Sequence, residues 1–315
     1  MKKALIKLHI AIFLAGTSGL FGKWVSLNET ALVWYRVLLS LLILGLTLAA
    51  TGRFKKLPLD HLWRIGSAGV ILVAHWLFFY ASIKAANVSV GVVCLSAVAF
   101  ITALIEPIFS KEACFSWKDI LLSIISVLGI VCIFSFDSQY RLGIIYGIIS
   151  STLVALLMIA NKQLRTLKIR TPKGFEKSEF EGKRYSAWFL LFVELCCGFF
   201  ALSIFILAST FLTNGLSLGE TWNSLALNYS PTPTDWTYLA VLAAVVTITP
   251  YALKIDALKY ISAFTVNLAN NMEPVYSIIL AAIFFNELEE LNLSFFIGLG
   301  LIALSVILQT LTIKR

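Results

Sequence analysis

Long apolar segments separated by short polar stretches run through the whole chain of 315 residues. A helix needs about 20 mostly apolar residues to cross the hydrocarbon core of a bilayer, and ten segments meet this requirement. They are residues 4–22, 30–50, 62–81, 88–109, 119–136, 142–161, 187–210, 236–253, 262–285 and 291–312. The pattern therefore predicts an all-α polytopic membrane protein with ten transmembrane helices.

The residue composition supports a location in lipid. Hydrophobic residues make up 59% of the chain and charged residues only 13%, a balance that soluble globular domains do not show. The first apolar segment follows Lys2 and Lys3, as in a secretion signal, but it continues through Gly16, Gly19 and Gly22 without a clear cleavage site of small residues. We therefore expect this segment to be retained as the first membrane helix.

Lysine and arginine residues sort to one side of the membrane if the N-terminus is cytoplasmic. The inner side then carries 21 of the 25 basic residues, whereas the outer side carries Lys23, Lys84 and Arg141, and Arg36 falls inside a helix. The outer stretch 211–235 contains no Lys or Arg. Because cytoplasmic loops are enriched in basic residues, the pattern predicts cytoplasmic N- and C-termini in a multi-pass protein of the cytoplasmic (inner) membrane.

The net charge of +8 is mostly a consequence of this sorting. It favours contact with anionic lipid of the inner leaflet and gives no reason to expect a nucleic-acid partner. The five cysteines lie in or beside membrane segments, which predicts packing residues and not a disulfide framework. The sequence shows no phosphate-binding loop and no metal-spaced His and Cys cluster, so we expect no cofactor, no metal site and no ATP hydrolysis by this chain.

The two halves of the sequence resemble each other. A shift of 175 residues sets Asp60 on Asp235 and Glu112 on Glu287, at equivalent ends of predicted helices. Each half holds five predicted helices, and an odd number of spans forces the second copy to insert from the opposite side of the membrane. We therefore predict two inverted five-helix repeats. The two domains are residues 1–141 and 142–315.

Three motifs of the second half resemble a known family. They are Ala257-Leu258-Lys259-Tyr260-Ile261-Ser262-Ala263, Met272-Glu273-Pro274-Val275 and Asn286-Glu287. Together they resemble the second-half signature of the EamA-type members of the drug/metabolite transporter superfamily. The resemblance implies ten helices with both termini inside, a central cavity lined by both halves, and secondary transport, commonly the export of small metabolites. The first half departs from this pattern, because Ala99 stands where a proline is expected.

The predicted ninth helix is the most polar of the ten at its centre. Asn267, Asn270, Asn271 and Pro274 share one helical face, and Glu273 lies beside that face. The stripe either lines a substrate cavity or forms hydrogen bonds between helices. Pro274 is a candidate hinge because it removes a backbone hydrogen bond. Glu273 is a candidate for proton coupling, for contact with a substrate amine, or for a neutral, hydrogen-bonded carboxyl.

Arg36 is the second candidate charge, because it lies inside the predicted second helix. Glu194 falls at the matching place in the equivalent helix of the other half. The two side chains either pair across the pseudo-two-fold axis, or Arg36 holds a substrate carboxylate. The sequence leaves both interpretations open.

Aromatic residues occupy equivalent helices of both halves. His75 and Trp76 align with Pro250 and Tyr251 at the 175-residue shift, and Tyr80 follows one turn after Trp76. The rings either form a stacking surface for a planar or apolar substrate or pack in the core. His75 is a candidate for proton transfer or for a simple buried hydrogen bond, and Pro250 is a second candidate hinge.

These features favour a secondary transporter that moves a small organic metabolite across the membrane by alternating access. We expect a neutral, zwitterionic or planar solute, such as an amino acid, because Arg36 is the only basic residue that lies away from the ends of the predicted spans. A nucleotide-sugar or sugar-phosphate exchanger of the same superfamily is the alternative within transporters. A polytopic enzyme acting on lipid-linked substrates is the alternative of another class, but the three His residues are too widely spaced to suggest a catalytic cluster. The small-xxx-small lines of the helices fit packing within one bundle, so a monomer is sufficient, although homo-oligomer contact stays open.

Overall fold

The computed structural model describes residues 2–55, 57–109, 140–164, 185–215, 217–251 and 272–286, with isolated positions at 117–132, 253 and 293–308. Within these ranges every regular element is a helix, as the apolar pattern predicts. The first half contains α1 (Lys2–Gly16), α2 (Ser18–Trp24), α3 (Glu29–Ala50), α4 (Leu59–Ala85), α5 (Val88–Cys94), η1 (Leu95–Ala97) and α6 (Val98–Phe109). The second half contains α8 (Arg141–Leu164), α10 (Ala187–Thr213), α11 (Leu218–Asn228), α12 (Pro233–Val241), η3 (Leu242–Ile248) and α15 (Glu273–Phe285).

Five helical segments of the described chain are long and apolar enough to cross a membrane. They are Leu5–Trp24, Glu29–Ala50, Leu59–Ala85, Arg141–Asn161 and Ala187–Thr213. Each corresponds to one of the ten predicted spans. Two shorter apolar helices, Val88–Thr102 and Glu273–Phe285, fall within two further spans. The predicted spans 119–136 and 291–312 lie mainly outside the described residues, so the number of ten stays a prediction.

Helix α4 lies at the centre of the described bundle, where it packs against α8, α10 and α3. The α4–α10 contact is close because both helices use glycine there. A Cβ atom built on Gly69 would lie 2.0 Å from the backbone oxygen of Glu194, and one built on Gly198 would lie 2.7 Å from the backbone oxygen of Gly69. Small residues thus let two backbones approach within van der Waals distance, as is common between membrane helices.

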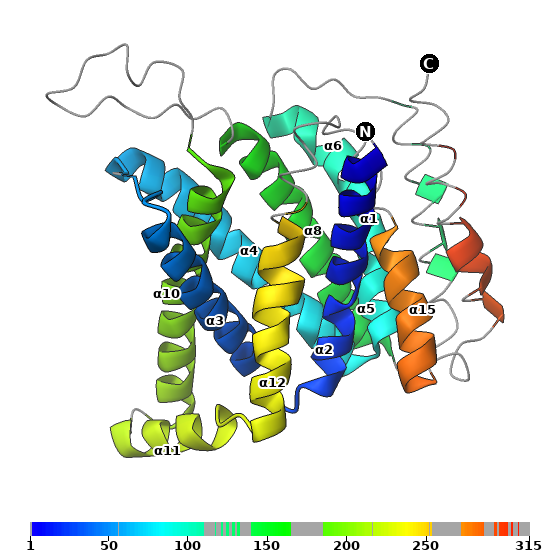
Figure 1. Ribbon diagram of the computed structural model, residues 1–315. Coiled ribbons are helices and arrows are strands. Elements are labelled where there is room, and N and C mark those ends of the chain that lie inside the picture. Colours follow the sequence, from blue (N-terminus) through cyan, green and yellow to red (C-terminus); the bar gives the residue numbers. More distant parts are fainter. Residues whose placement is uncertain are drawn as a thin grey trace, which may run out of the picture.

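The bundle has two ends that are easily located in Figure 1. The N-terminus and the beginning of α4 lie at one end, here called the N-terminal end, whereas α11 and the beginning of α12 lie at the other, the α11 end. Side-chain caps set several helix starts. Asn28 accepts a hydrogen bond from the Ala31 amide at 2.8 Å, and Thr232 and Asp235 form a reciprocal capping box at the start of α12.

Two apolar helices are interrupted in the interior of the bundle. The first breaks at Thr17, between α1 and α2, where the Thr17 hydroxyl donates to the Leu14 carbonyl at 2.6 Å. The second widens into the π-helix η3, which ends just before Pro250. Proline has no amide hydrogen to donate to the carbonyl four residues earlier, and π turns often occur at functional sites. Both irregularities lie against the same side chain, that of Arg36.

Candidate functional site

Arg36 projects from α3 into the bundle interior, where only 4% of the residue is exposed. A guanidinium at such a position is costly unless its N–H groups find acceptors. Nε donates to the Thr247 hydroxyl at 3.0 Å, whereas Nη1 donates to the Tyr80 hydroxyl at 2.8 Å and to the Ser18 hydroxyl at 3.3 Å. The acceptors come from α2, α4 and η3, so this one side chain connects elements of both halves of the sequence.

An aromatic ring covers one face of the guanidinium. Cζ of Arg36 lies 3.9 Å from the ring centroid of Trp76 and 5.8 Å from that of Tyr80. Arginine stacks favourably on aromatic faces, and the attraction strengthens where water is excluded. Trp76 therefore fixes the plane in which Arg36 presents its donors.

The supporting hydroxyl groups are themselves held in place. The Ser18 and Tyr80 hydroxyls lie 3.0 Å apart, and the Thr247 hydroxyl donates to the Leu242 carbonyl inside η3 at 2.8 Å. Gly22 allows α2 to approach α4, because a Cβ atom at this position would lie 2.7 Å from Cδ1 of Tyr80. The break at Thr17 and the π-helix thus bring two hydroxyl groups to opposite edges of one guanidinium.

Glu273 supplies a negative charge on the same interior side. It begins α15, and its carboxylate interacts electrostatically with Arg36. The start of α15 packs against the end of α1. The Ser277 hydroxyl donates to the Gly16 carbonyl, and a Cβ atom on Gly16 would lie 3.1 Å from the Glu273 backbone oxygen. Glu273 therefore lies beside the break that positions Ser18.

The structure brings some predicted site residues together and separates others. Arg36, Trp76 and Tyr80 form one cluster, with Glu273 acting on it through its charge. Among the described ion pairs none joins Arg36 to Glu194, since the guanidinium turns to Ser18, Tyr80 and Thr247. The predicted stripe of amides, Asn267, Asn270 and Asn271, lies outside the described residues.

His75 and Tyr251 belong to other contacts. His75 Nδ1 lies 2.8 Å from the Ser150 hydroxyl of α8, and the Tyr251 hydroxyl donates to the Ala187 carbonyl at 2.9 Å. Each aromatic residue thus ties a helix to its neighbour, and His75 also lies within electrostatic range of Arg36.

The two candidate hinges lie beside helix irregularities. Pro250 is buried two residues after the end of η3, and Pro274 lies in the first turn of α15. In a first turn the missing amide hydrogen of proline has no intrahelical acceptor to lose.

Sequence reasoning missed Ser18 and Thr247. Hydroxyl residues are common in membrane helices and carry no signal by themselves. Two weak signals were available: Ser18 follows Gly16 in a glycine-containing helix, and Thr247 precedes Pro250 by three residues. Neither signal indicates that the two residues converge on Arg36.

A second polar cluster closes the α11 end of the bundle. The buried carboxylate of Asp235 accepts hydrogen bonds from the Ser26 amide at 2.7 Å and from the Ser26 hydroxyl at 2.6 Å. The Tyr35 hydroxyl donates to the Tyr229 carbonyl at 2.7 Å, again between the two halves. Burial raises the pKa of Asp235, but the hydrogen bonds from Ser26 and Thr232 outweigh it and hold the pKa below its usual value.

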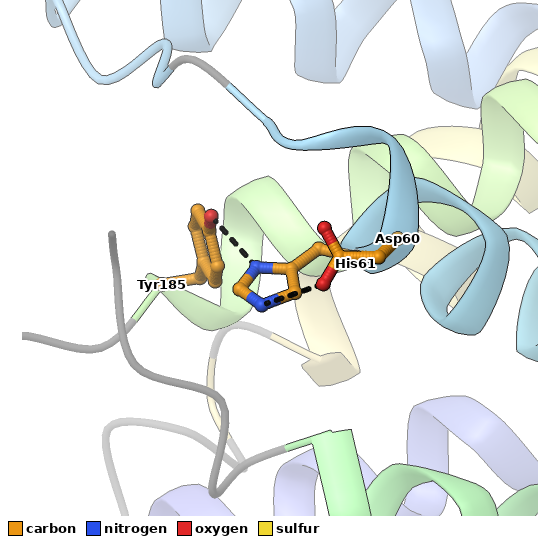
Figure 2. Close-up of polar contacts among 3 residues, drawn as sticks. All are labelled: Asp60, His61 and Tyr185. Atoms are coloured by element: carbon orange, nitrogen blue, oxygen red, sulfur yellow. Dashed lines mark hydrogen bonds and ion pairs between the residues drawn. The ribbon is translucent and has the colours of Figure 1, made fainter. Parts of the chain in front are cut away.

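A third cluster lies at the N-terminal end, at the start of α4. Figure 2 shows the His61 ring between the Tyr185 hydroxyl and the Asp60 carboxylate. Nδ1 of His61 lies 3.1 Å from the Tyr185 hydroxyl, and Nε2 lies 3.8 Å from Oδ2 of Asp60. Tyr185 directly precedes the N-cap of α10, so this contact also joins the two halves. No group of three or more metal-binding side chains occurs within the described ranges.

A family model described as the EamA-like transporter family matches residues 2–135 and 141–311. The Bacillus subtilis (strain 168) protein named "Uncharacterized transporter YxxF" is 27% identical over 157 residues, which are 49% of this chain and 46% of that protein. The match therefore spans about half of that relative.

One solved structure, described only as the crystal structure of a protein, is similar in fold. Its TM-score is 0.61 at 15% sequence identity, and the similarity covers 99% of both chains. At this identity the likeness concerns the fold alone.

Proposed function

The chain belongs to the EamA-like transporter family, and from this premise we propose that it carries a small organic metabolite across the cytoplasmic membrane as a secondary transporter. We propose an exporter that works by alternating access. The Arg36 cluster is the observation that carries the proposal. A buried cation held by Ser18, Tyr80 and Thr247 has no evident role in a purely structural bundle, because apolar residues would fill the space at lower cost.

The family membership confirms the resemblance seen in the motifs, and the chain is a multi-pass membrane protein. For its architecture we propose ten helices in two inverted repeats, residues 1–141 and 142–315, with both termini cytoplasmic. The family model matches twice, over 2–135 and 141–311, and the second match begins within one residue of this boundary, which supports it. Inverted repeats with a site near the middle of the bilayer are common in secondary transporters.

Alternating access requires contacts that close each end of the bundle and can be broken. The Ser26–Asp235 contact at the α11 end and the His61–Tyr185 contact at the N-terminal end both join the two halves. Along α4, His61 and Lys84 are separated by roughly 35 Å at 1.5 Å per residue, and Lys84 donates to the Val25 carbonyl near Ser26. The two closures therefore lie on opposite sides of the Arg36 cluster. From the charge pattern we propose that the α11 end faces the outside.

Counterflow in proteoliposomes tests the proposed function. A thermal-shift screen of the purified protein with amino acids, nucleobases and organic acids first selects solutes that bind. Vesicles are then loaded with an unlabelled solute and diluted into a trace of the same solute carrying a label. A carrier gives transient accumulation of label above equilibrium, whereas a channel gives only equilibration and an enzyme gives a product. Absence of accumulation for every solute that binds would contradict the proposal.

A further inference from the structure

We infer that the transported solute carries a carboxylate and that Nη2 of Arg36 donates to one of its oxygens. The inference rests on the proposed function, because it names the chemical class of solute that the Arg36 cluster accepts. It extends the sequence-based expectation, which left a neutral, zwitterionic or planar solute open. Four observations on Arg36 and its neighbours carry it.

The first observation is the use of the five N–H groups of the guanidinium. Nε makes one hydrogen bond, to Thr247, and Nη1 makes two, to Tyr80 and Ser18. Within the described ranges Nη2 donates no hydrogen bond, although it carries two hydrogens. An arginine donor without an acceptor is costly in a bilayer-spanning bundle. Among the described residues, Nη2 therefore presents an N–H edge that a further acceptor can fill.

The second observation is that Nη2 is not fully enclosed. Among the described residues, the polar side-chain atoms that are both enclosed and without a partner belong to Ser40, Asn87, Thr102 and Asn214, and not to Arg36. Arg36 keeps 4% of its surface exposed. Since Nε and Nη1 face protein hydroxyls, Nη2 is the guanidinium nitrogen left for a further partner, and it is not fully enclosed.

The third observation is the direction of approach. Trp76 covers a face of the guanidinium, with its ring centroid 3.9 Å from Cζ, so an acceptor reaches Nη2 in the guanidinium plane and not from that face. In-plane approach to an N–H edge is the geometry in which arginine binds carboxylates. Because Nε and Nη1 are already occupied, the open edge offers one nitrogen and suits a single oxygen of a small acid.

The fourth observation is the balance of charge. Glu273 acts electrostatically on Arg36, so the positive charge of the cluster is already partly compensated. A carboxylate adds one negative charge, whereas a phosphate monoester adds about two near neutral pH, close to an acidic residue. The cluster therefore favours a monocarboxylate over a phosphate. Glu273 also provides a counter-charge for an amino group, if the same solute carries one.

Binding of matched acid and amide pairs tests the inference. The probes are L-leucine with L-leucinamide, L-phenylalanine with L-phenylalaninamide, and benzoate with benzamide; inorganic phosphate is the anion control. Binding to the full-length protein in nanodiscs is followed by intrinsic tryptophan fluorescence, because Trp76 lies against the Arg36 guanidinium. We expect at least one acid to bind about tenfold or more tightly than its amide, as for a charged hydrogen bond in a buried site. We expect phosphate to bind more weakly than that acid.

Two substitutions sharpen the test. Arg36→Gln is expected to reduce the preference for acid over amide to about one, and Arg36→Lys to retain part of it because the charge remains. Arg53→Gln, at an exposed position just after α3, is the matched control and should leave the preference unchanged. If Arg36→Gln does not fold, the inference is tested by comparing acid with amide binding in the unmodified protein and in Arg36→Lys.

Several outcomes would overturn the inference. The inference is wrong if the amides bind as tightly as their acids, or if phosphate binds more tightly than every acid. It is also wrong if no acid of the panel binds, or if Arg36→Gln keeps the full preference for acid over amide. If an uncharged solute shows counterflow and acids bind no more tightly than their amides, this inference is wrong but the proposed transport function stands. Lack of counterflow by any solute contradicts the proposed function itself, so the two failures are distinguishable.

Discussion

Ser26 donates two hydrogen bonds to the carboxylate of Asp235, one from its amide at 2.7 Å and one from its hydroxyl at 2.6 Å, across 209 residues of sequence. The pair joins the segment before α3 to the start of α12, and so fastens the first half to the second at the α11 end. Asp235 at the same time caps its own helix through Thr232. One carboxylate thus determines both a helix start and a contact between the halves.

Asp235→Asn is expected to lower the stability of the bundle by about 2 kcal/mol, because an amide is a weaker acceptor than a carboxylate and presents donors where Ser26 also donates. Thermal unfolding in detergent measures the loss. Asp60→Asn, at the aligned position of the other half, is the control, since the Asp60 side chain is half exposed. Equal destabilisation by both substitutions would contradict the role given to Asp235.

The same carboxylate predicts a pH dependence. The folded-state pKa of Asp235 lies below its ordinary value because of the hydrogen bonds from Ser26 and Thr232. Its contribution to stability is therefore present above the unfolded pKa of about 4 and is lost as pH falls through the lowered pKa. Unfolding temperatures measured from pH 7 down to pH 3 should fall more steeply for the unmodified protein than for Asp235→Asn. Parallel curves would exclude this contribution.

Gly69→Ala is expected to destabilise the α4–α10 packing by about 1 to 3 kcal/mol. The added methyl group would lie 2.0 Å from the Glu194 backbone oxygen, so one helix must move. Gly219→Ala in α11 is the control, because nothing lies within 4 Å of a Cβ atom built there. Ligand-free thermal unfolding compares the two variants, and an unchanged midpoint for Gly69→Ala would show that the helices are not packed this closely.

Thr247→Val is expected to weaken solute binding and counterflow by about tenfold, because it removes the acceptor of Arg36 Nε and leaves a buried charged donor without a partner. Thr249→Val, at the residue directly after the π-helix, is the matched control. The Thr249 hydroxyl donates to the Ala244 carbonyl, and the described contacts of Arg36 do not include it. Similar losses in both variants would assign the effect to the π-helix and not to Arg36.

Thiol labelling tests the proposed orientation. Asn223→Cys in α11 should react with a membrane-impermeant maleimide added to intact cells, because the stretch 211–235 is predicted outside. Ser178→Cys, in the basic stretch 162–186, should react only after the membrane is permeabilised. The reverse labelling pattern would invert the proposed topology.

The apolar segments of the chain predicted a bundle of membrane helices, because a run of about 20 apolar residues identifies such a helix in the sequence. Five predicted spans correspond to long apolar helices. The break at Thr17 and the π-helix before Pro250 were not predicted, since hydrophobicity stays high through both. The short polar helix α11 was also missed, because its residues lie in a stretch that was interpreted only as a connection.

The candidate site was predicted in part. Arg36, Trp76 and Tyr80 were selected as a buried charge and as aromatic residues, in two separate interpretations, and the structure places them in contact. Their meeting depends on how α3 and α4 pack, which spacing along one chain does not specify. His75 was grouped with Trp76 by helical spacing, but it turns to Ser150 of α8 instead.

The central claim is that the Arg36 cluster is the solute site of a carrier. Counterflow by two matched lysine variants tests this claim most directly. A lysine at position 36 keeps the charge but loses the planar fork of donors that serves Thr247, Tyr80 and the solute together. We expect Arg36→Lys to reduce counterflow by about tenfold or more, whereas Arg53→Lys should retain the rate of the unmodified protein. Full counterflow by correctly folded Arg36→Lys, or an equal loss in both variants, would contradict the account.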